Sequence, residues 1–396
     1  MPDPVQDGQM ADRDLDALTP TTLRARRSLK WNLYPADVIP LWVAEMDYPT
    51  APPVMAALRR AVDDEVFGYP LNARRSGLGE TLSAWLDGRY GWQVDPADVH
   101  LVPDVMRGVA LAIETFSGPT DAVVLPTPLY HPFFEVVELT GRPQVHVPMT
   151  RTDGGPWTLD LPGIDQALAH GARTVVLCNP HNPLGRVSTR AELLALSEVV
   201  ERHGARVVAD EVHNPLVLDG EHLPYASLSE VTAAHTTTML SASKAWNLPG
   251  LRCAQVVTGN GADRRAWQRI PQWSSVGVSS LGIEASIAAY RDGGEWLEGV
   301  LDLLRAHARL VAEAVEAMPG VRHERNQGTY LAWLDLTELG LDTEPADWFL
   351  ERARVALYAG PPFRAQPHRF ARLNFATTTP VLSEALERMA RALPPS

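Results

Sequence analysis

Residues 174–213 read TVVLCNPHNPLGRVSTRAELLALSEVVERHGARVVADEVH. Apolar runs at 174–178 and 205–209 indicate two buried strands, and the apolar spacing of 189–203 between them is typical of an amphipathic helix. The pattern extends along the chain, with helical spacing at 53–66 and 105–117 and further apolar runs at 122–125, 236–240 and 253–258. Strands that alternate with helices predict an α/β domain built on a mainly parallel sheet.

The end of the chain is organised differently. Helical patterns continue to about residue 318, after which strand-like segments at 330–336 and 372–375 and a helix near 345–354 predict a smaller α+β unit. We therefore predict three parts, which are an N-terminal arm with part of the small domain at 1–52, a large domain at 53–290 and a C-terminal small domain at 291–396. Residues 1–28 are polar and acidic, and we expect them to be loose or to lie over a partner subunit.

Composition narrows the class of protein. The chain of 396 residues is 45% hydrophobic with a formal net charge of −13, which favours a globular protein with small-molecule ligands and argues against nucleic-acid binding. Its two cysteines, Cys178 and Cys253, lie in apolar runs and are expected to be buried thiols in a reducing compartment. No stretch reaches ~18 apolar residues, and no secretory pattern opens the chain. We expect a cytoplasmic enzyme without a membrane segment, and we predict no metal site.

Polar side chains follow two of the predicted strands. The run 174–178 leads into a turn rich in asparagine and proline that includes Asn182, and the next run is followed by Asp210 and His213. Ligands of open α/β sheets bind at the carboxyl ends of the strands. The asparagine turn by itself is compatible with an ordinary turn. A carboxylate at the end of a buried strand needs a partner, and a protonated ring nitrogen would meet that need.

One lysine lies among small hydroxyl residues. Residues 241–252 read SASKAWNLPGLR, which places Lys244 beside Ser243 and eight positions before Arg252. An isolated string of this kind is also compatible with a solvated surface lysine. We interpret Lys244 as a Schiff-base lysine, because an amine whose pKa is lowered by its surroundings can attack a carbonyl carbon.

Together, the asparagine turn, Asp210 and Lys244 resemble the fold-type I enzymes that use pyridoxal 5′-phosphate. More specifically, the chain from about residue 27 to its end resembles the MalY/PatB-type cystathionine β-lyases, also called C–S lyases, of the class I/II aminotransferase superfamily. The motifs that carry the resemblance are KWN at 30–32, LWVAEMD at 41–47, FGY at 67–69, LYHPF at 129–133, CNPHNPLG at 178–185, DEVH at 210–213, SKAWNLPGL at 243–251 and RLN at 372–374. The resemblance implies a mainly parallel seven-stranded sheet sandwiched by helices, plus a smaller α+β domain.

The resemblance also implies roles for the residues around the cofactor. Lys244 would hold the cofactor covalently and move protons once the substrate displaces it. Asp210 would pair with the pyridinium nitrogen and Tyr130 would stack on the ring, so these three are the predicted catalytic residues. Asn182 and His213 would contact the phenolic oxygen, although a histidine near a strand end would also suit a structural hydrogen bond.

Further roles concern the phosphate, the partner subunit and the substrate. The implied phosphate contacts are the helix-start amides of Val105 and Met106 and the side chains of Ser241, Ser243 and Arg252. Tyr69 would reach the phosphate of a neighbouring subunit, which implies a homodimer with shared active sites. Arg372 would clamp the α-carboxylate of an amino-acid substrate with two parallel hydrogen bonds, assisted by the Ala44 amide and by Asn182.

Two single residues and one triplet depart from the family pattern. Glu45 stands where the family usually has aspartate, Asp104 stands where it has glycine just before the phosphate helix, and Ser241-Ala242-Ser243 replaces alanine-proline-serine. A carboxylate near a phosphate is unfavourable unless it points away. We expect the cofactor site to survive these changes, whereas substrate selection is less constrained by the resemblance.

The resemblance favours α,β-elimination from cystathionine or another L-cysteine S-conjugate, giving a thiol, pyruvate and ammonia. An aminotransferase acting on an L-amino acid is the alternative, favoured by Ser241 and Arg252, and a regulatory protein on the same fold is a third. Lys244 and Asp210 argue against a purely non-catalytic role. The sequence does not identify the thioether, because one methylene in an apolar pocket changes selectivity by only ~1–3 kcal/mol.

Overall fold

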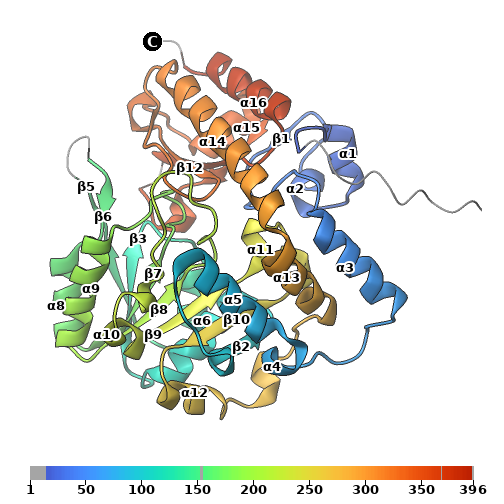
Figure 1. Ribbon diagram of the computed structural model, residues 1–396. Helices are drawn as coiled ribbons and strands as arrows, with labels where there is room; N and C mark the ends of the chain where they lie inside the picture. Colours follow the sequence, from blue (N-terminus) through green and yellow to red (C-terminus); the bar gives the residue numbers. More distant parts are fainter. Residues whose placement is uncertain (1–14, 152–154, 367, 395–396) are drawn as a thin grey trace, which may run out of the picture.

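The central sheet organises the larger part of the molecule. The computed structural model describes residues 15–151, 155–366 and 368–394 (Figure 1). Within them, seven strands form one sheet in the order β2-β10-β9-β8-β7-β3-β4. Their bounds are β2 Val99–Val102, β3 Ala122–Thr127, β4 Gln144–Pro148, β7 Ala172–Cys178, β8 Arg206–Asp210, β9 Thr236–Leu240 and β10 Ala254–Thr258. All neighbouring strands are parallel except β10, which is antiparallel to β2 and β9. The predicted α/β fold with a mainly parallel sheet is confirmed.

Helices cover both faces of this sheet. One face packs against α8 (Leu161–Ala169) and α9 (Arg190–Arg202), and the other against α6 (Val105–Phe116), α7 (Pro132–Leu139) and α12 (Gly261–Trp267). Along β7, Val175 and Leu177 belong to the first cluster, whereas Val176 and Cys178 belong to the second. Successive side chains of a strand point to opposite faces, so a strand covered on both sides is apolar throughout. This explains the continuous apolar runs in the sequence.

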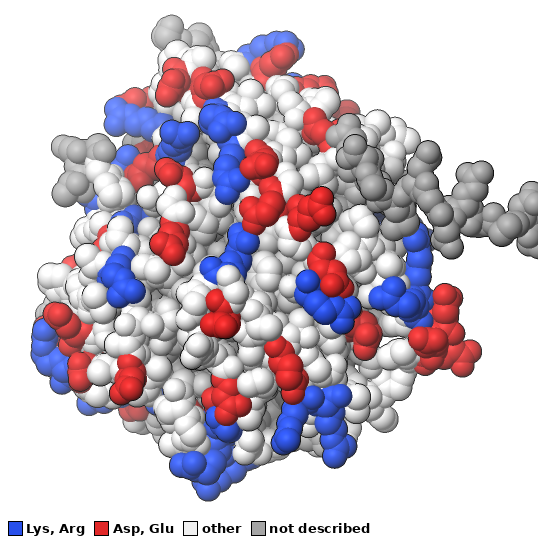
Figure 2. All heavy atoms as spheres, viewed as in Figure 1, with Lys and Arg blue, Asp and Glu red and all other residues white. Residues whose placement is uncertain are grey.

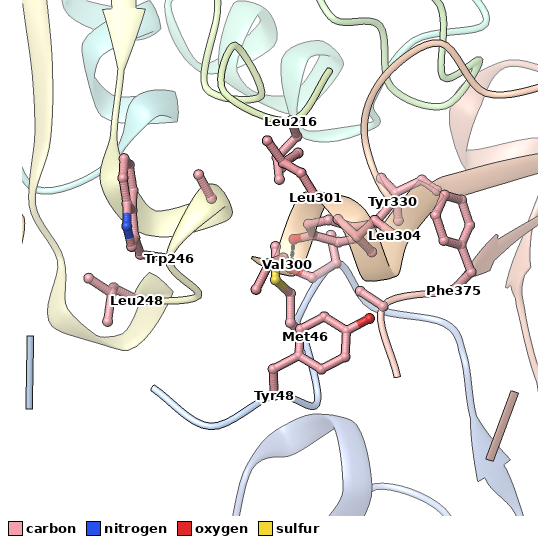
Figure 3. Packing of buried hydrophobic residues seen from close by; sticks show 14 of the residues in the cluster. Met46, Tyr48, Leu216, Trp246, Leu248, Val300, Leu301, Leu304, Tyr330 and Phe375 are labelled. Atoms are coloured by element: carbon pink, nitrogen blue, oxygen red, sulfur yellow. Dashed lines mark hydrogen bonds between the residues drawn. The ribbon is translucent and has the colours of Figure 1, made fainter. Parts of the chain in front are cut away.

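A third group of helices connects the sheet to the C-terminal part. It contains α3 (Pro52–Asp63), α5 (Leu78–Tyr90), α13 (Ser280–Asp292) and the long α14 (Gly294–Glu316), which runs diagonally across Figure 1. Their core is continuous with the N-terminal segment. Figure 3 shows Met46 and Tyr48 of that segment in one cluster with Val300 and Leu304 of α14 and with Phe375. This shared core ties three distant parts of the sequence together.

The C-terminal part contains a four-stranded antiparallel sheet in the order β11-β12-β15-β14. Its elements are β11 Arg322–His323, β12 Leu331–Asp335, α15 Pro345–Arg352, β14 Tyr358–Ala359, β15 Phe370–Asn374 and α16 Thr379–Arg391. Beside them, β1 (Ile39–Pro40) pairs in parallel with β13 (Val355–Ala356), which joins the N-terminal segment to this part. The domain boundaries expected at residues 52/53 and 290/291 stay a prediction.

Short elements complete the description. They are α1 Pro20–Ala25, α2 Leu29–Asn32, α4 Ala73–Ser76, α10 Glu230–Ala234, α11 Ala242–Ala245 and the pair β5 Thr150–Arg151 and β6 Trp157–Thr158. Residues 1–28 are predicted to be loose or to lie over a partner subunit. For α1 the first alternative is wrong, because Thr19 caps this helix, Pro20 starts it and Leu23 is buried, and the second stays a prediction. Residues 1–14 of the predicted arm lie outside the described residues.

The surface and the thiols agree with the composition. Basic and acidic side chains are interspersed over the face shown in Figure 2, so this face carries no continuous basic patch. Cys178 and Cys253 are buried free thiols, as predicted. Within the described ranges, no helix combines the length and the apolar character needed to cross a membrane.

Candidate active site

A cavity of about 170 Å³ lies at the carboxyl ends of β7, β8 and β9. Its lining brings together many of the residues predicted from the sequence, which are Ala44, Val105, Met106, Tyr130, Asn182, Asp210, His213, Ser241, Ser243, Lys244 and Arg252. Two larger hollows, of about 950 and 600 Å³, contain none of these residues. Chemistry therefore identifies the candidate site better than volume does, and its position agrees with the rule for open α/β sheets.

The turn after β9 positions Lys244. Ser241 is the N-cap of α11, where its hydroxyl accepts a hydrogen bond from the Ser243 amide at 3.0 Å and donates to the Cys253 carbonyl at 2.9 Å. Both roles of this hydroxyl are structural, and they fix the start of α11. The Lys244 Nζ then donates to the carbonyl oxygen of Ala44 at 3.1 Å.

The surroundings of Lys244 weaken its basicity. Burial, assisted by the charge of Arg372, lowers the pKa of Lys244 to about 8, against the opposing charges of Asp210 and Glu45. The only other lysine of the chain, Lys30, is buried in an ion pair. Lys244 is therefore the one lysine in this protein whose amine is available at the cavity.

Asp210 and His213 lack the partners that buried polar groups usually have. Asp210 is 4% exposed, and in the described part of the chain its side chain accepts one hydrogen bond, from the Val212 amide at 3.1 Å. Burial raises the pKa of Asp210 to about 7. Burial also lowers the pKa of His213, whose Nδ1 is buried without a hydrogen-bond partner among the described residues. A bound ring with a protonated nitrogen and a nearby oxygen would satisfy both groups.

The start of α6 offers an anion site beside them. Asp104 caps this helix by accepting a hydrogen bond from the Arg107 amide at 2.8 Å, and its other oxygen accepts one from Arg252 Nη2 at 2.7 Å. The amides of Val105 and Met106 are in the first turn, which has no intrahelical acceptors for them. The unexpected Asp104 carboxylate is thus directed to the cap and to Arg252, while these two amides line the cavity.

Arg372 is a buried cation without a counter-ion. This side chain on β15 is 1% exposed, and it donates from Nη1 to Asn182 Oδ1 and from Nη2 to the Trp42 carbonyl, both at 3.0 Å. Its Nε is buried with no partner, and no carboxylate within the described ranges pairs with the guanidinium. Burial lowers the pKa of Arg372 to about 10, so it stays charged at neutral pH. A carboxylate ligand would supply the missing charge.

Side chains that the sequence did not single out hold the loop 41–47 against the cavity. Asn374 donates to two carbonyl oxygens of this loop, at 2.6 and 2.7 Å, and the Tyr330 hydroxyl donates to a third at 3.1 Å. Lys30 forms a buried ion pair of 2.7 Å with Asp47 and donates to one of the same carbonyls. Lys30 and Asn374 lie in the motifs KWN and RLN, but no local pattern in these motifs indicates which groups they bind.

Of the two tyrosines predicted to contact the cofactor, one lines the cavity and the other does not. Tyr130 lines the cavity and packs edge to face on Phe133, with ring centroids 6.2 Å apart. Tyr69 lies outside the cavity and is fully exposed on the segment between α3 and α4. Its predicted contact with a neighbouring subunit lies beyond this single chain, and this role stays a prediction.

An amine of lowered pKa, a buried carboxylate and an anion-binding helix start at one sheet edge define an α/β enzyme built to hold a phosphorylated ring cofactor. Residues 36–389 match the family model of class I and II aminotransferases, and the chain belongs to this family.

Similar proteins refine this placement. The chain is 39% identical to the cystathionine beta-lyase of Corynebacterium glutamicum, over 94% of this chain and 98% of the relative. It is 32% identical to the cystathionine beta-lyase PatB of Bacillus subtilis, over 93% of this chain and 97% of the relative. The crystal structure of a putative PLP-dependent beta-cystathionase from Corynebacterium diphtheriae superposes with a TM-score of 0.90 at 38% identity, covering 95% of this chain and 98% of that one. The expected resemblance and fold type are confirmed.

Proposed function

We propose that this protein is a pyridoxal 5′-phosphate-dependent C–S lyase that eliminates a thiol from cystathionine or another L-cysteine S-conjugate, releasing pyruvate and ammonia. The observation that carries the proposal is that Lys244 and Asp210 line one cavity and Arg372 donates to Asn182 of the same lining, in a chain that is 39% identical to a cystathionine beta-lyase over nearly its whole length. Their separate needs, for a carbonyl, a cationic ring nitrogen and a carboxylate, are met together by this cofactor and an amino acid.

Each residue has a task that its environment supports. When bound, the cofactor supplies an electron sink for the charge that develops at the substrate Cα. Asp210 would hold a proton on the ring nitrogen, and the amides of Val105 and Met106 would bind the phosphate. Lys244 would take the proton from Cα and return one to the departing sulfur. Arg372 orients the α-carboxylate, so that the Cα–H bond faces the lysine.

The reaction type is tested with purified protein and a panel of thioethers. Pyruvate and free thiol should appear from cystathionine or an S-alkyl cysteine without any keto acid, because elimination regenerates the cofactor. An aminotransferase would instead stop after one turnover with the cofactor in its amine form, and would resume only after a keto acid is added. Failure of the whole panel would remove the lyase proposal. A Lys244→Ala variant that kept the protein's cellular effect would favour the regulatory alternative.

The pH dependence of cofactor capture follows from the lowered pKa of Lys244. Only the neutral amine attacks an aldehyde, so capture of pyridoxal 5′-phosphate by the cofactor-free protein should accelerate as pH rises and level off above about 8. An ordinary lysine, with a pKa near 10.5, would keep accelerating to higher pH. Stopped-flow absorbance from pH 6.5 to 10 measures the rate, with free Nα-acetyllysine as the reference amine. A profile that matches the reference would contradict the assignment.

The proposal includes a homodimer in the cytoplasm. Phe67, Tyr69 and Trp273 are 65%, 102% and 85% exposed, and a hydrogen bond of 2.8 Å from Ser280 to the Gly68 carbonyl joins their two segments. Large exposed apolar side chains favour a subunit contact. We propose that this contact brings Tyr69 to the partner's phosphate. Sedimentation should give twice the chain mass of 43.4 kDa.

A further inference from the structure

The guanidinium of Arg372 has aromatic neighbours. Its central carbon lies 5.0 Å from the ring centroid of Tyr358 and 5.0 Å from that of Phe363. The two hydrogen bonds to Asn182 and Trp42 fix one edge of the guanidinium, whereas the rings limit how its plane can tilt. Aromatic faces also attract the cation, which compensates part of the cost of burying it. The orientation of Arg372 thus depends on where these rings lie.

Tyr358 is itself held from the other side of the site. Its hydroxyl lies 3.1 Å from Nε2 of His131, and the two rings stack with centroids 5.2 Å apart at an interplanar angle of 28°. His131 follows Tyr130 directly, whereas Tyr358 is on β14 of the four-stranded sheet. The hydrogen bond therefore connects the segment after β3 of the central sheet to the sheet that carries Arg372.

The protonation of His131 decides the direction of this bond. Burial lowers the pKa of His131, the charge of Glu135 opposes the shift and the charge of Arg372 adds to it, so at neutral pH the ring is uncharged and carries one N–H. Its Nδ1 is buried and has no partner among the described residues. A proton on Nδ1 would leave a buried donor unpaired, so we assign it to Nε2, which then donates to the Tyr358 oxygen. The ring of Tyr358 also packs on Trp42, at 6.3 Å and 26°.

We propose that Tyr358, fixed by its hydrogen bond with His131, is a positioning residue for Arg372 and thereby sets the affinity for the substrate α-carboxylate. The inference deepens the proposed function and rests on it. Trp42 takes part twice, because its carbonyl accepts from Arg372 and its ring packs on Tyr358. The Tyr358 ring and the Trp42 carbonyl hold the guanidinium from two sides, so the unpartnered Nε–H of Arg372 points in one direction. Because the group is already ordered, less conformational entropy is lost when a carboxylate binds.

The test compares Tyr358→Phe with wild type. This variant keeps the ring and removes only the hydroxyl, so we expect KM for the thioether amino acid to rise roughly 2- to 10-fold, the value of one hydrogen bond, with kcat within about twofold. The α-carboxamide of the same substrate lacks the carboxylate charge. For this amide, kcat/KM should be the same in Tyr358→Phe and in wild type. Tyr34→Phe is the matched control, because Tyr34 packs edge to face on Trp42, with ring centroids 6.1 Å apart, and no hydrogen bond or ring contact joins it to Arg372 in the described part of the chain.

A double-mutant cycle separates positioning from general packing. His131→Phe keeps a stacked ring without the hydrogen bond, so His131→Phe and Tyr358→Phe together should raise KM no more than either change alone. Additive effects, an equal loss with the carboxamide, or the same KM change in Tyr34→Phe would overturn the proposal. If Tyr358→Phe proved unfolded by its melting curve, His131→Phe would carry the test.

A binding measurement keeps this inference distinct from the proposed function. Propionate has the carboxylate but no amine, so its dissociation constant, measured by saturation-transfer NMR on the holoprotein, reports Arg372 without turnover. The dissociation constant should rise in Tyr358→Phe by the same factor as KM. If this rise were observed in a protein without lyase activity, only the proposed reaction would be refuted. An unchanged dissociation constant would remove the positioning role even in an active lyase.

Discussion

Lys244→Ala should abolish lyase activity, lowering kcat/KM by about 10⁴-fold or more, because the cofactor's covalent attachment and a general base worth ~10²–10⁴-fold are lost together. The visible absorbance of the lysine-linked cofactor should disappear in the same variant. Spectra and pyruvate formation measure the two effects on one sample. The protein should still fold, because among the residues that the structure describes the amine makes a single hydrogen bond, to the Ala44 carbonyl.

The scarcity of lysine makes this prediction unusually direct. The chain has two lysines, and Lys30 is buried against Asp47 at 2.7 Å. Borohydride reduction of the holoprotein followed by peptide mapping should therefore place the cofactor mass on the peptide with Lys244 and nowhere else. Lys30→Arg is the matched control, since it keeps a cation for Asp47 and should keep the absorbance band. A modified Lys30 peptide, or a band that survives in Lys244→Ala, would refute the assignment.

Arg372→Lys should lower kcat/KM by roughly 30-fold to several thousand-fold, corresponding to the ~2–5 kcal/mol lost when one partner of a buried charge pair is removed. Lysine keeps the charge but has no planar fork, so it cannot bind Asn182, the Trp42 carbonyl and a substrate carboxylate at once. The loss should appear mainly in KM, measured with the best thioether of the panel.

Two controls delimit the effect of Arg372→Lys. Arg369→Lys changes an exposed arginine next to the same strand and should leave both kinetic constants unchanged. The cofactor absorbance of Arg372→Lys should also match wild type, because this side chain is assigned to the substrate and not to the cofactor. A weakened cofactor band, or an unchanged kcat/KM, would show that the carboxylate binds elsewhere.

Much of the fold could be predicted because the signal is local. The runs at 174–178 and 236–240 coincide closely with β7 and β9, since a strand covered on both faces favours apolar and β-branched residues and carries no charged side chain in these runs. The antiparallel direction of β10 was not predicted. An apolar run of 5 residues has the same composition in either direction, and only its pairing with β2 and β9 sets the direction.

Many of the residues that line the candidate cavity could be predicted from the sequence, but their contacts could not. The apolar pattern locates the strand ends, and Asp210 and Lys244 closely follow two of them. Because the carboxyl ends of parallel strands meet at one edge of a sheet, the two residues could be expected to share a cavity. Asp104 illustrates the limit. The sequence shows only that its carboxylate must point away from a bound phosphate, whereas the structure shows that it caps α6 and pairs with Arg252, 148 positions away. No local pattern predicts which partner a capping side chain takes with its second oxygen.

The sequence by itself determined the alternation of strands and helices, the turns that end the strands and the one lysine that lies in such a turn, because each depends on neighbours a few positions apart. The tertiary structure decided the properties of the side chains. The lowered pKa of Lys244, the unpartnered Nδ1 of His213 and the enclosure of Arg372 all arise from burial and from contacts such as the one between Arg372 and Trp42, 330 positions apart. Burial and charge act through space, and the chain order does not record them.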